Sequence, residues 1–245
     1  MTESSAEPIV APAPAKGLLA RAVGIIVSPR ATYADIAARP RVLAALVLIL
    51  AISATGTIAL LSTEVGRNAA LDQQIRQAES FGRPMSDAQY AQMEKALPYF
   101  GYIGAAGQII VLTIVVLIIS GLMFAVFNAF MGGDATFKQV MAVVTHSGFV
   151  FTVQSFFVLP LDYVRQSLTS PTSLSIFVPF LEETSFPARF LGALDLFVMW
   201  WVLNLAIGLG VLYKKRTGGV ATGLFITYLV IALCIAAVRS MLSGA

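Results

Sequence analysis

Five long apolar stretches dominate this sequence and restrict the folds open to it. They lie at about residues 41–62, 103–130, 140–161, 188–212 and 218–238. Each approaches the ~20 residues with which an α-helix crosses ~30 Å of hydrocarbon. None alternates apolar and polar residues as a transmembrane β-strand does, whereas a helix pairs its own backbone groups in lipid. The sequence therefore predicts an all-α integral membrane protein with a bundle of five transmembrane helices.

Composition and residue counts exclude several other classes of protein. Of the 245 residues, 58% are hydrophobic and 12% are charged, against about 45–50% and about 25% in a soluble domain. Such a chain is neither a soluble globular enzyme nor a coiled coil. Cys234 is the only cysteine and His146 the only histidine, so a disulfide framework, a zinc-thiolate cluster and an HExxH site are excluded. We expect no cofactor, no metal and no nucleic-acid partner.

The polar segments around the spans divide the chain into three regions. Residues 1–15 are small, polar and interrupted by prolines, which predicts a disordered tail. Residues 16–40 carry Lys16 and Arg21 beside apolar residues at roughly helical spacing. They form either an amphipathic juxtamembrane helix on the cytoplasmic membrane surface or a helix packed against the protein's own loops. Residues 41–240 form the five-span membrane domain.

The longest connection between spans, residues 63–97, predicts two short amphipathic helices on the outer face of the membrane. Leu71 and Ile75 stand among mixed charges in its first half. In its second half, Ser86 precedes Gln89 at the spacing of a helix N-cap. The segment is too small to hold a catalytic domain with a core of its own.

The distribution of lysine and arginine predicts which end of the bundle faces the cytoplasm. With five spans, the two termini lie on opposite sides. The side of the N-terminus then carries Lys16, Arg21, Arg30, Arg39, Arg41, Lys138, Lys214, Lys215 and Arg216. Lys214, Lys215 and Arg216 fill one very short loop, and basic residues of short loops stay in the cytoplasm. We therefore expect a cytoplasmic N-terminus and an outer C-terminus, with Lys16, Arg21 and this loop at the membrane surface.

Asp195 is the first candidate for a functional residue inside the membrane. It lies some two turns into the fourth apolar stretch, where a carboxylate costs about 2.5–3.5 kcal/mol. A functional Asp195 would bind a proton, a cation or a ligand, whereas a structural one would be neutral or hydrogen-bonded to a neighbouring helix. Asn204 follows in the same stretch, four residues before Gly208, at a spacing that lets helix backbones approach closely.

The third apolar stretch is the most polar one and supplies further candidates. It contains His146 and Gln154, and Ser147 shares a helix face with Gln154. These residues either line a cavity, with His146 facing Asp195, or join helices by hydrogen bonds of ~0.6 kcal/mol each. We expect polar contacts within the membrane from Asp195, His146, Asn204 and Gln154.

A tight cytoplasmic turn is predicted between the second and third spans. Gly132 and Gly133 permit the turn, because glycine adopts backbone conformations that other residues avoid. Either Asp134 or Thr136 then caps the helix that follows.

Three segments together resemble the Yip-domain family of small multi-span membrane proteins, and its bacterial branch in particular. They are SPRATYADIAARP at 28–40, GGDATFKQVMAVVTHS at 132–147 and DLFVMWWVLNLAIGLG at 195–210. The resemblance covers about residues 17–240. Family members often carry a proline soon after the polar turn of the third span, where this sequence reads HSGF at 146–149.

The resemblance implies a scaffold without enzymatic activity. Eukaryotic members of the family are similar to trafficking scaffolds that bind lipidated Ypt/Rab GTPases and one another, and a bacterium lacks that machinery in the same form. We therefore predict a non-enzymatic multi-pass protein of the bacterial inner membrane, a scaffold or adaptor that acts through helix–helix, protein-partner or lipid contacts, including those of a homo-oligomer. The alternative is a small transporter or channel with Asp195 and the polar third span lining its pathway, although the chain lacks the internal repeat of many transporters.

Overall fold

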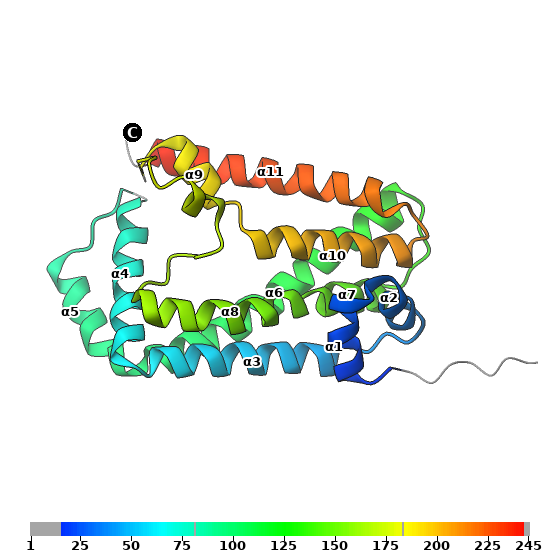
Figure 1. Ribbon diagram of the computed structural model, residues 1–245, viewed down its shortest axis with the longest axis horizontal. Helices are drawn as coiled ribbons and strands as arrows, with labels where there is room; N and C mark the ends of the chain where they lie inside the picture. The colour runs from blue at the N-terminus through cyan, green and yellow to red at the C-terminus, as the bar shows by residue number, and fades with distance from the viewer. Residues whose placement is uncertain (1–15, 81, 183, 243–245) are drawn as a thin grey trace, which may run out of the picture.

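The computed structural model describes residues 16–80, 82–182 and 184–242, and every regular element within them is a helix. The predicted disordered tail, residues 1–15, lies outside the described residues. The long helices lie side by side along one axis (Figure 1). Among them, α3 (Leu43–Leu61), α6 (Phe100–Phe124) and α11 (Thr217–Leu242) are strongly apolar, as lipid-facing helices are. The all-α prediction is confirmed.

Four helical stretches of the described chain are long and apolar enough to cross a membrane, one fewer than predicted. They are Leu43–Leu61, Asp87–Phe130, Phe137–Arg165 and Thr217–Leu242. The stretch predicted at 188–212 is divided into α9 (Phe186–Gly192) and α10 (Leu196–Leu212). The 17 residues of α10 span about 26 Å, which is shorter than a hydrocarbon core of ~30 Å. The count of five spans is therefore not confirmed, although α10 runs alongside α11 (Figure 1).

The third span consists of two helices, α7 (Phe137–Ser147) and α8 (Phe149–Arg165). The helices meet at Gly148, whose N–H donates to the carbonyl of Thr145 at 3.1 Å. This bond spans three residues instead of four, as in a tightened terminal turn. The span therefore breaks at its polar turn without a proline there.

Capping boxes start the two helices for which the sequence supplied capping signals. Thr136 Oγ1 accepts from the N–H of Gln139 at 3.3 Å, and Gln139 Oε1 accepts from the N–H of Thr136 at 2.8 Å. Ser86 and Gln89 make the same pair of bonds at the start of α5 (Asp87–Ala96). Thr136, not Asp134, is therefore the cap of α7. In the turn before it, Gly132 has φ +66°, in the region that favours glycine.

Short helices cover both ends of the bundle. At one end, α1 (Leu18–Val27) and α2 (Pro29–Ala38) pack against α7 and α10. At the opposite end, α4 (Glu64–Ser80) packs against α3 and α8, burying Ala69, Ala70 and Leu71. Both α1 and α4 run across the axis of the long helices (Figure 1). Residues 16–40 therefore pack within the protein, against the bundle helices and not against its loops. Their place on the cytoplasmic membrane surface stays a prediction.

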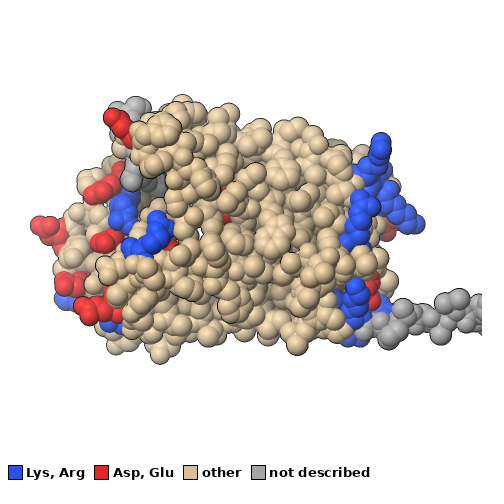
Figure 2. All heavy atoms as spheres, in the orientation of Figure 1, with Lys and Arg blue, Asp and Glu red and all other residues tan. Residues whose placement is uncertain are grey.

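The charged residues gather at the two ends of the molecule. Figure 2 shows a broad tan band, almost free of charged atoms on this face, between them. The end that holds α1, α2 and the turns at 131–136 and 213–216, hereafter the basic end, is mainly blue, and the opposite end carries most of the acidic residues (Figure 2). This pattern is typical of a protein whose apolar middle lies in a bilayer.

Helix α10 packs closely against α2 and α7. Gly208 is buried on α10. A Cβ atom at Gly208 would lie 2.6 Å from Val143 Cγ1 and 2.8 Å from Tyr33 Cε1, closer than packed carbon atoms approach. Glycine therefore sets the distance between α10 and its two neighbours.

Replacing Gly208 by alanine should lower the thermal midpoint of the protein in detergent. The added methyl group overpacks the interface, which typically costs about 1–3 kcal/mol. Gly223→Ala on α11 is the matched control, because nothing lies within 4 Å of its Cβ position. Equal midpoints for the two variants, measured by fluorescence-detected size exclusion after heating, would contradict the close packing.

Candidate functional site

The three segments that carry the family resemblance meet at the basic end. Residues 28–40 form α2, residues 132–147 lead into α7, and residues 195–210 begin α10, and these helices contact one another. A side-chain hydrogen bond joins each pair of helices. The bonds are Tyr33 Oη to Asn204 Oδ1 at 2.9 Å, Gln139 Nε2 to the Ala37 carbonyl at 3.0 Å and Trp201 Nε1 to Ser147 Oγ at 2.9 Å. We call this assembly the three-segment core.

A buried ion pair holds α1 against α2 beside this core. Arg21 is only 1% exposed, and its Nε and Nη2 atoms both lie 2.8 Å from Asp35 Oδ2. Nη2 also donates to the carbonyl of Arg39 at 3.1 Å. The predicted place of Arg21 at the membrane surface is therefore wrong, because a carboxylate 14 residues further along draws the guanidinium inward. The other predicted surface cations differ: Lys214, Lys215 and Arg216 are exposed, and half-buried Lys16 donates to Thr32 Oγ1 at 3.2 Å.

The inward position of Arg21 turns apolar residues of α1 outward. Leu19 is 73% exposed, Val23 61% and Val27 76%. Together with Ile26 they form the α1 outer face. Its exposed apolar side chains lie at the basic end, so α1 offers an apolar strip beside cationic residues.

Asn204 links α10 to both α1 and α2. Its Oδ1 accepts from the hydroxyl of Tyr33, and its Nδ2 donates to the carbonyl of Ile25 at 3.3 Å. Tyr33 is fully buried, and burial raises the pKa of Tyr33 well above its usual value. The hydroxyl therefore stays protonated and remains a donor.

His146 and Asp195 do not pair within the described residues. His146 is fully buried, and its Nδ1 lies 2.7 Å from the carbonyl oxygen of Ala142. Because a carbonyl only accepts, Nδ1 carries the proton in this contact. Nε2 of His146 has no partner in the described part of the chain.

Asp195 is the N-cap of α10, so it precedes this helix and does not lie two turns inside it as predicted. Its Oδ1 accepts from the N–H groups of Phe197 at 2.8 Å and Val198 at 3.3 Å. Its Oδ2 accepts from Ser170 Oγ at 2.8 Å and Thr172 Oγ1 at 2.6 Å. The carboxylate thus satisfies amides that every helix start leaves free, and it ties the loop to α10. An aspartate directly before an apolar run is the sequence signal that indicates this role.

A second network, missed in the sequence, fixes the turn at the basic end. Tyr213 Oη donates to Asn128 Oδ1 at 2.6 Å, and Asn128 Nδ2 donates to the carbonyl of Ala135 at 2.7 Å. Burial, helped by the negative charge of Asp134, raises the pKa of Tyr213 to about 12. A Cβ on Gly133 would meet the Tyr213 ring at 2.5 Å, so this glycine lets the ring lie against the turn.

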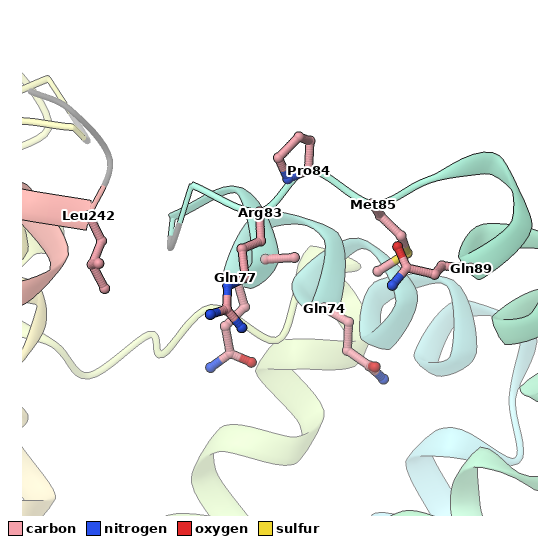
Figure 3. Close-up of a pocket in the computed structure, with 8 residues that line it drawn as sticks. Gln74, Gln77, Arg83, Pro84, Met85, Gln89 and Leu242 are labelled. Carbon is pink, nitrogen blue, oxygen red and sulfur yellow. The ribbon is translucent and has the colours of Figure 1, made fainter.

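The first of two hollows borders the three-segment core through Trp201, and the second lies at the opposite end. Gln154 lines a cavity of about 280 Å³ between α3, α6 and the third span. A groove of about 660 Å³ runs from α4 and the segment after it to the end of α11. Figure 3 shows Arg83 and Gln77 extending in the same direction in this groove, with Leu242 on its far side. None of the predicted site residues lines the groove, and the described residues contain no group of three or more potential His, Cys, Asp or Glu metal ligands.

Removing one member of the Arg21–Asp35 pair should destabilise the protein more than removing both. Asp35→Leu leaves the buried Arg21 charge without its carboxylate, which costs about 3–5 kcal/mol. Arg21→Met leaves Asp35 with only the more distant Arg39 guanidinium, at 3.9 Å. We expect a large drop of the thermal midpoint for each single variant and partial recovery for the double variant. Arg30→Met is the control, since Arg30 is exposed and, among the described residues, binds only Thr217 Oγ1. Additive losses in the double variant would contradict the buried pair.

A comparison with protein families finds a match that covers most of the chain. The Yip1 domain matches residues 23–239. No curated protein and no solved structure matches the chain. The matched range contains all three segments of the core and nearly all of the helical bundle. The chain is therefore a member of the Yip1-domain family of membrane proteins.

Proposed function

We propose that this protein is a non-enzymatic scaffold or adaptor of the membrane whose basic end contacts lipid headgroups and a membrane partner. The observation that carries the proposal is the α1 outer face. Apolar side chains that a fold leaves uncovered mark contact surfaces when they form a contiguous strip. Here an ion pair turns that strip outward, and the three-segment core holds it in place.

We further propose that the basic end faces the cytoplasm of a bacterium and that the C-terminus lies outside. The short exposed loop of Lys214, Lys215 and Arg216 supports this orientation, because such loops are retained on the cytoplasmic side. The α1 outer face then lies next to the anionic inner leaflet. Cationic side chains near that surface each gain about 1 kcal/mol from it.

The transporter alternative needed Asp195 and the polar third span in one pathway. Asp195 instead caps α10 and binds the loop through Ser170 and Thr172. It is absent from the residues that line the two cavities beside Gln154. The geometry therefore favours the scaffold.

Cysteine labelling tests the orientation. In a Cys234→Ser background, Ala88→Cys on α5 and Met241→Cys near the end of α11 should react with a membrane-impermeant maleimide on intact cells. Ser28→Cys between α1 and α2 should react only after permeabilisation. All three positions are exposed. Labelling of Ser28→Cys on intact cells would mean that the orientation is the reverse. Protection of Met241→Cys alone would mean that α10 and α11 together cross the membrane only once, so that the C-terminus lies inside.

Native mass spectrometry after mild extraction tests the scaffold itself. The wild-type protein should carry a stoichiometric partner protein or form a defined oligomer. The double change Leu19→Asp/Val23→Asp should reduce that complex by at least tenfold, because burying each apolar side chain contributes about 1.5–3 kcal/mol. Tyr90→Asp on exposed α5 is the control and should leave the complex intact. A wild-type protein without any partner, or a complex that survives the double change, would contradict the proposal.

A further inference from the structure

The cavity beside Gln154 has features of a ligand site that the three-segment core does not use. It has a volume of about 280 Å³ and adjoins a second cavity of about 200 Å³. The two share four lining residues, so they form one continuous space. The shared residues are Ser53, Gln108, Gln154 and Ser155.

The walls of this space contain three polar groups without a partner. Thr145 is 1% exposed. The hydroxyl oxygens of Thr145 and Thr152 are buried and have no hydrogen-bond partner within the described residues. The amide of Gln154 likewise has no hydrogen-bond partner there. An unpaired buried polar group carries a desolvation penalty of about 1–3 kcal/mol. Two such hydroxyls, beside the half-buried and unpaired amide of Gln154, indicate that something polar binds among them.

The neighbouring polar groups are already paired and form the rest of the wall. Gln108 Nε2 donates to Ser53 Oγ at 2.6 Å, and Gln108 Oε1 accepts from Thr57 Oγ1 at 2.6 Å. Ser155 Oγ donates to the carbonyl of Phe151 at 2.9 Å. The free hydrogen-bonding capacity of the cavity therefore concentrates on Thr145, Thr152 and Gln154.

The lining also sets the charge and shape of the occupant. Among the described residues, neither cavity is lined by lysine, arginine, histidine, aspartate or glutamate, so a charged group would lack a counter-charge. The remaining walls are aliphatic or aromatic, including Phe151 and Trp201. An occupant must therefore be uncharged and largely apolar, with a polar part that hydrogen-bonds.

The cavity opens sideways towards lipid. Helix α6 packs against α3 and α7, and α8 packs against α3 and α10, while α6 and α8 make no extensive contact with each other. Val115 of α6 lines the cavity and is 39% exposed, so the wall reaches the outer surface of the bundle. Small-molecule sites typically have cavity volumes of about 300–1,000 Å³. An acyl chain can extend from this space into the bilayer.

We propose that this cavity binds an uncharged lipid whose hydroxyl or ester-carbonyl groups hydrogen-bond to Thr145, Thr152 and Gln154. The site is distinct from the α1 outer face, so the two proposals can fail separately. Trp201, which lines the cavity, also donates to Ser147 of the three-segment core. It is therefore an internal reporter of occupancy.

A quenching titration tests the site in the full-length protein. The chain has two tryptophans, so Trp200→Phe leaves Trp201 as the only indole. The protein is placed in phosphatidylcholine nanodiscs and titrated with diacylglycerol brominated on its acyl chains, or with phosphatidic acid carrying the same chains. Diacylglycerol should quench Trp201 saturably, whereas phosphatidic acid should give only the linear background of bulk lipid.

Matched variants separate the cavity from general lipid contact. Thr145→Val/Thr152→Val/Gln154→Leu should weaken the saturable phase by about fivefold for each polar group removed. Thr113→Val on α6 should leave it unchanged, because Thr113 donates to the carbonyl of Ile109 and does not line the cavity. If the triple variant does not fold, Thr152→Val alone should still show a fivefold loss.

Three results would overturn the proposal. Purely linear quenching by diacylglycerol would mean that this lipid does not bind in the cavity. Equal saturable quenching by phosphatidic acid would mean that the site does not select an uncharged head. Unchanged quenching in the valine variants would place the bound lipid elsewhere.

Discussion

The buried ion pair between Arg21 and Asp35 is the interaction on which the basic end depends. A guanidinium taken out of water is tolerated only beside a well-placed carboxylate, and both Nε and Nη2 of Arg21 lie 2.8 Å from the same carboxylate oxygen. The pair therefore fixes how α1 lies on α2. It also decides which side of α1 faces outward, and so it produces the apolar α1 outer face as a by-product of burying a charge.

The position of α2 in turn organises the bundle. Tyr33 reaches Asn204 on α10, and Gly208 lets the ring of Tyr33 approach the α10 backbone. Asp195 fixes where α10 begins by capping it, and thus which residues of α10 face α2 and α7. Segments far apart in the sequence are joined by single hydrogen bonds at defined positions. These bonds hold α1 in a fixed position on the bundle, as the proposed scaffold function requires.

The sequence predicts the elements that depend on local composition and spacing. Apolar length predicts α3, α6 and α11, and the capping signals predict the starts of α5 and α7, because each of these signals acts within a few residues. The roles of Arg21 and Asp195 depend on the tertiary arrangement or on a helix break. From the sequence, Arg21 is predicted to be a surface cation, because only the turn at Pro29 brings Asp35 beside it. Asp195 is predicted to lie inside a helix, because the break before α10 falls in an apolar run. The sequence does not predict that the hydroxyls of Thr145 and Thr152 lack partners, because this depends on how the surrounding helices enclose them.

Hydrogen–deuterium exchange of the intact protein in nanodiscs tests most directly whether residues 16–40 belong to the folded core. Backbone amides of α1 and α2 should exchange as slowly as those of α7, because Arg21, Tyr33 and Asn204 lock these helices to the bundle. Helix α5, which buries no residue, should exchange fast and serves as the internal reference. If α1 and α2 exchange as fast as α5, the segment is a detached surface helix, and the account of a fixed platform is wrong.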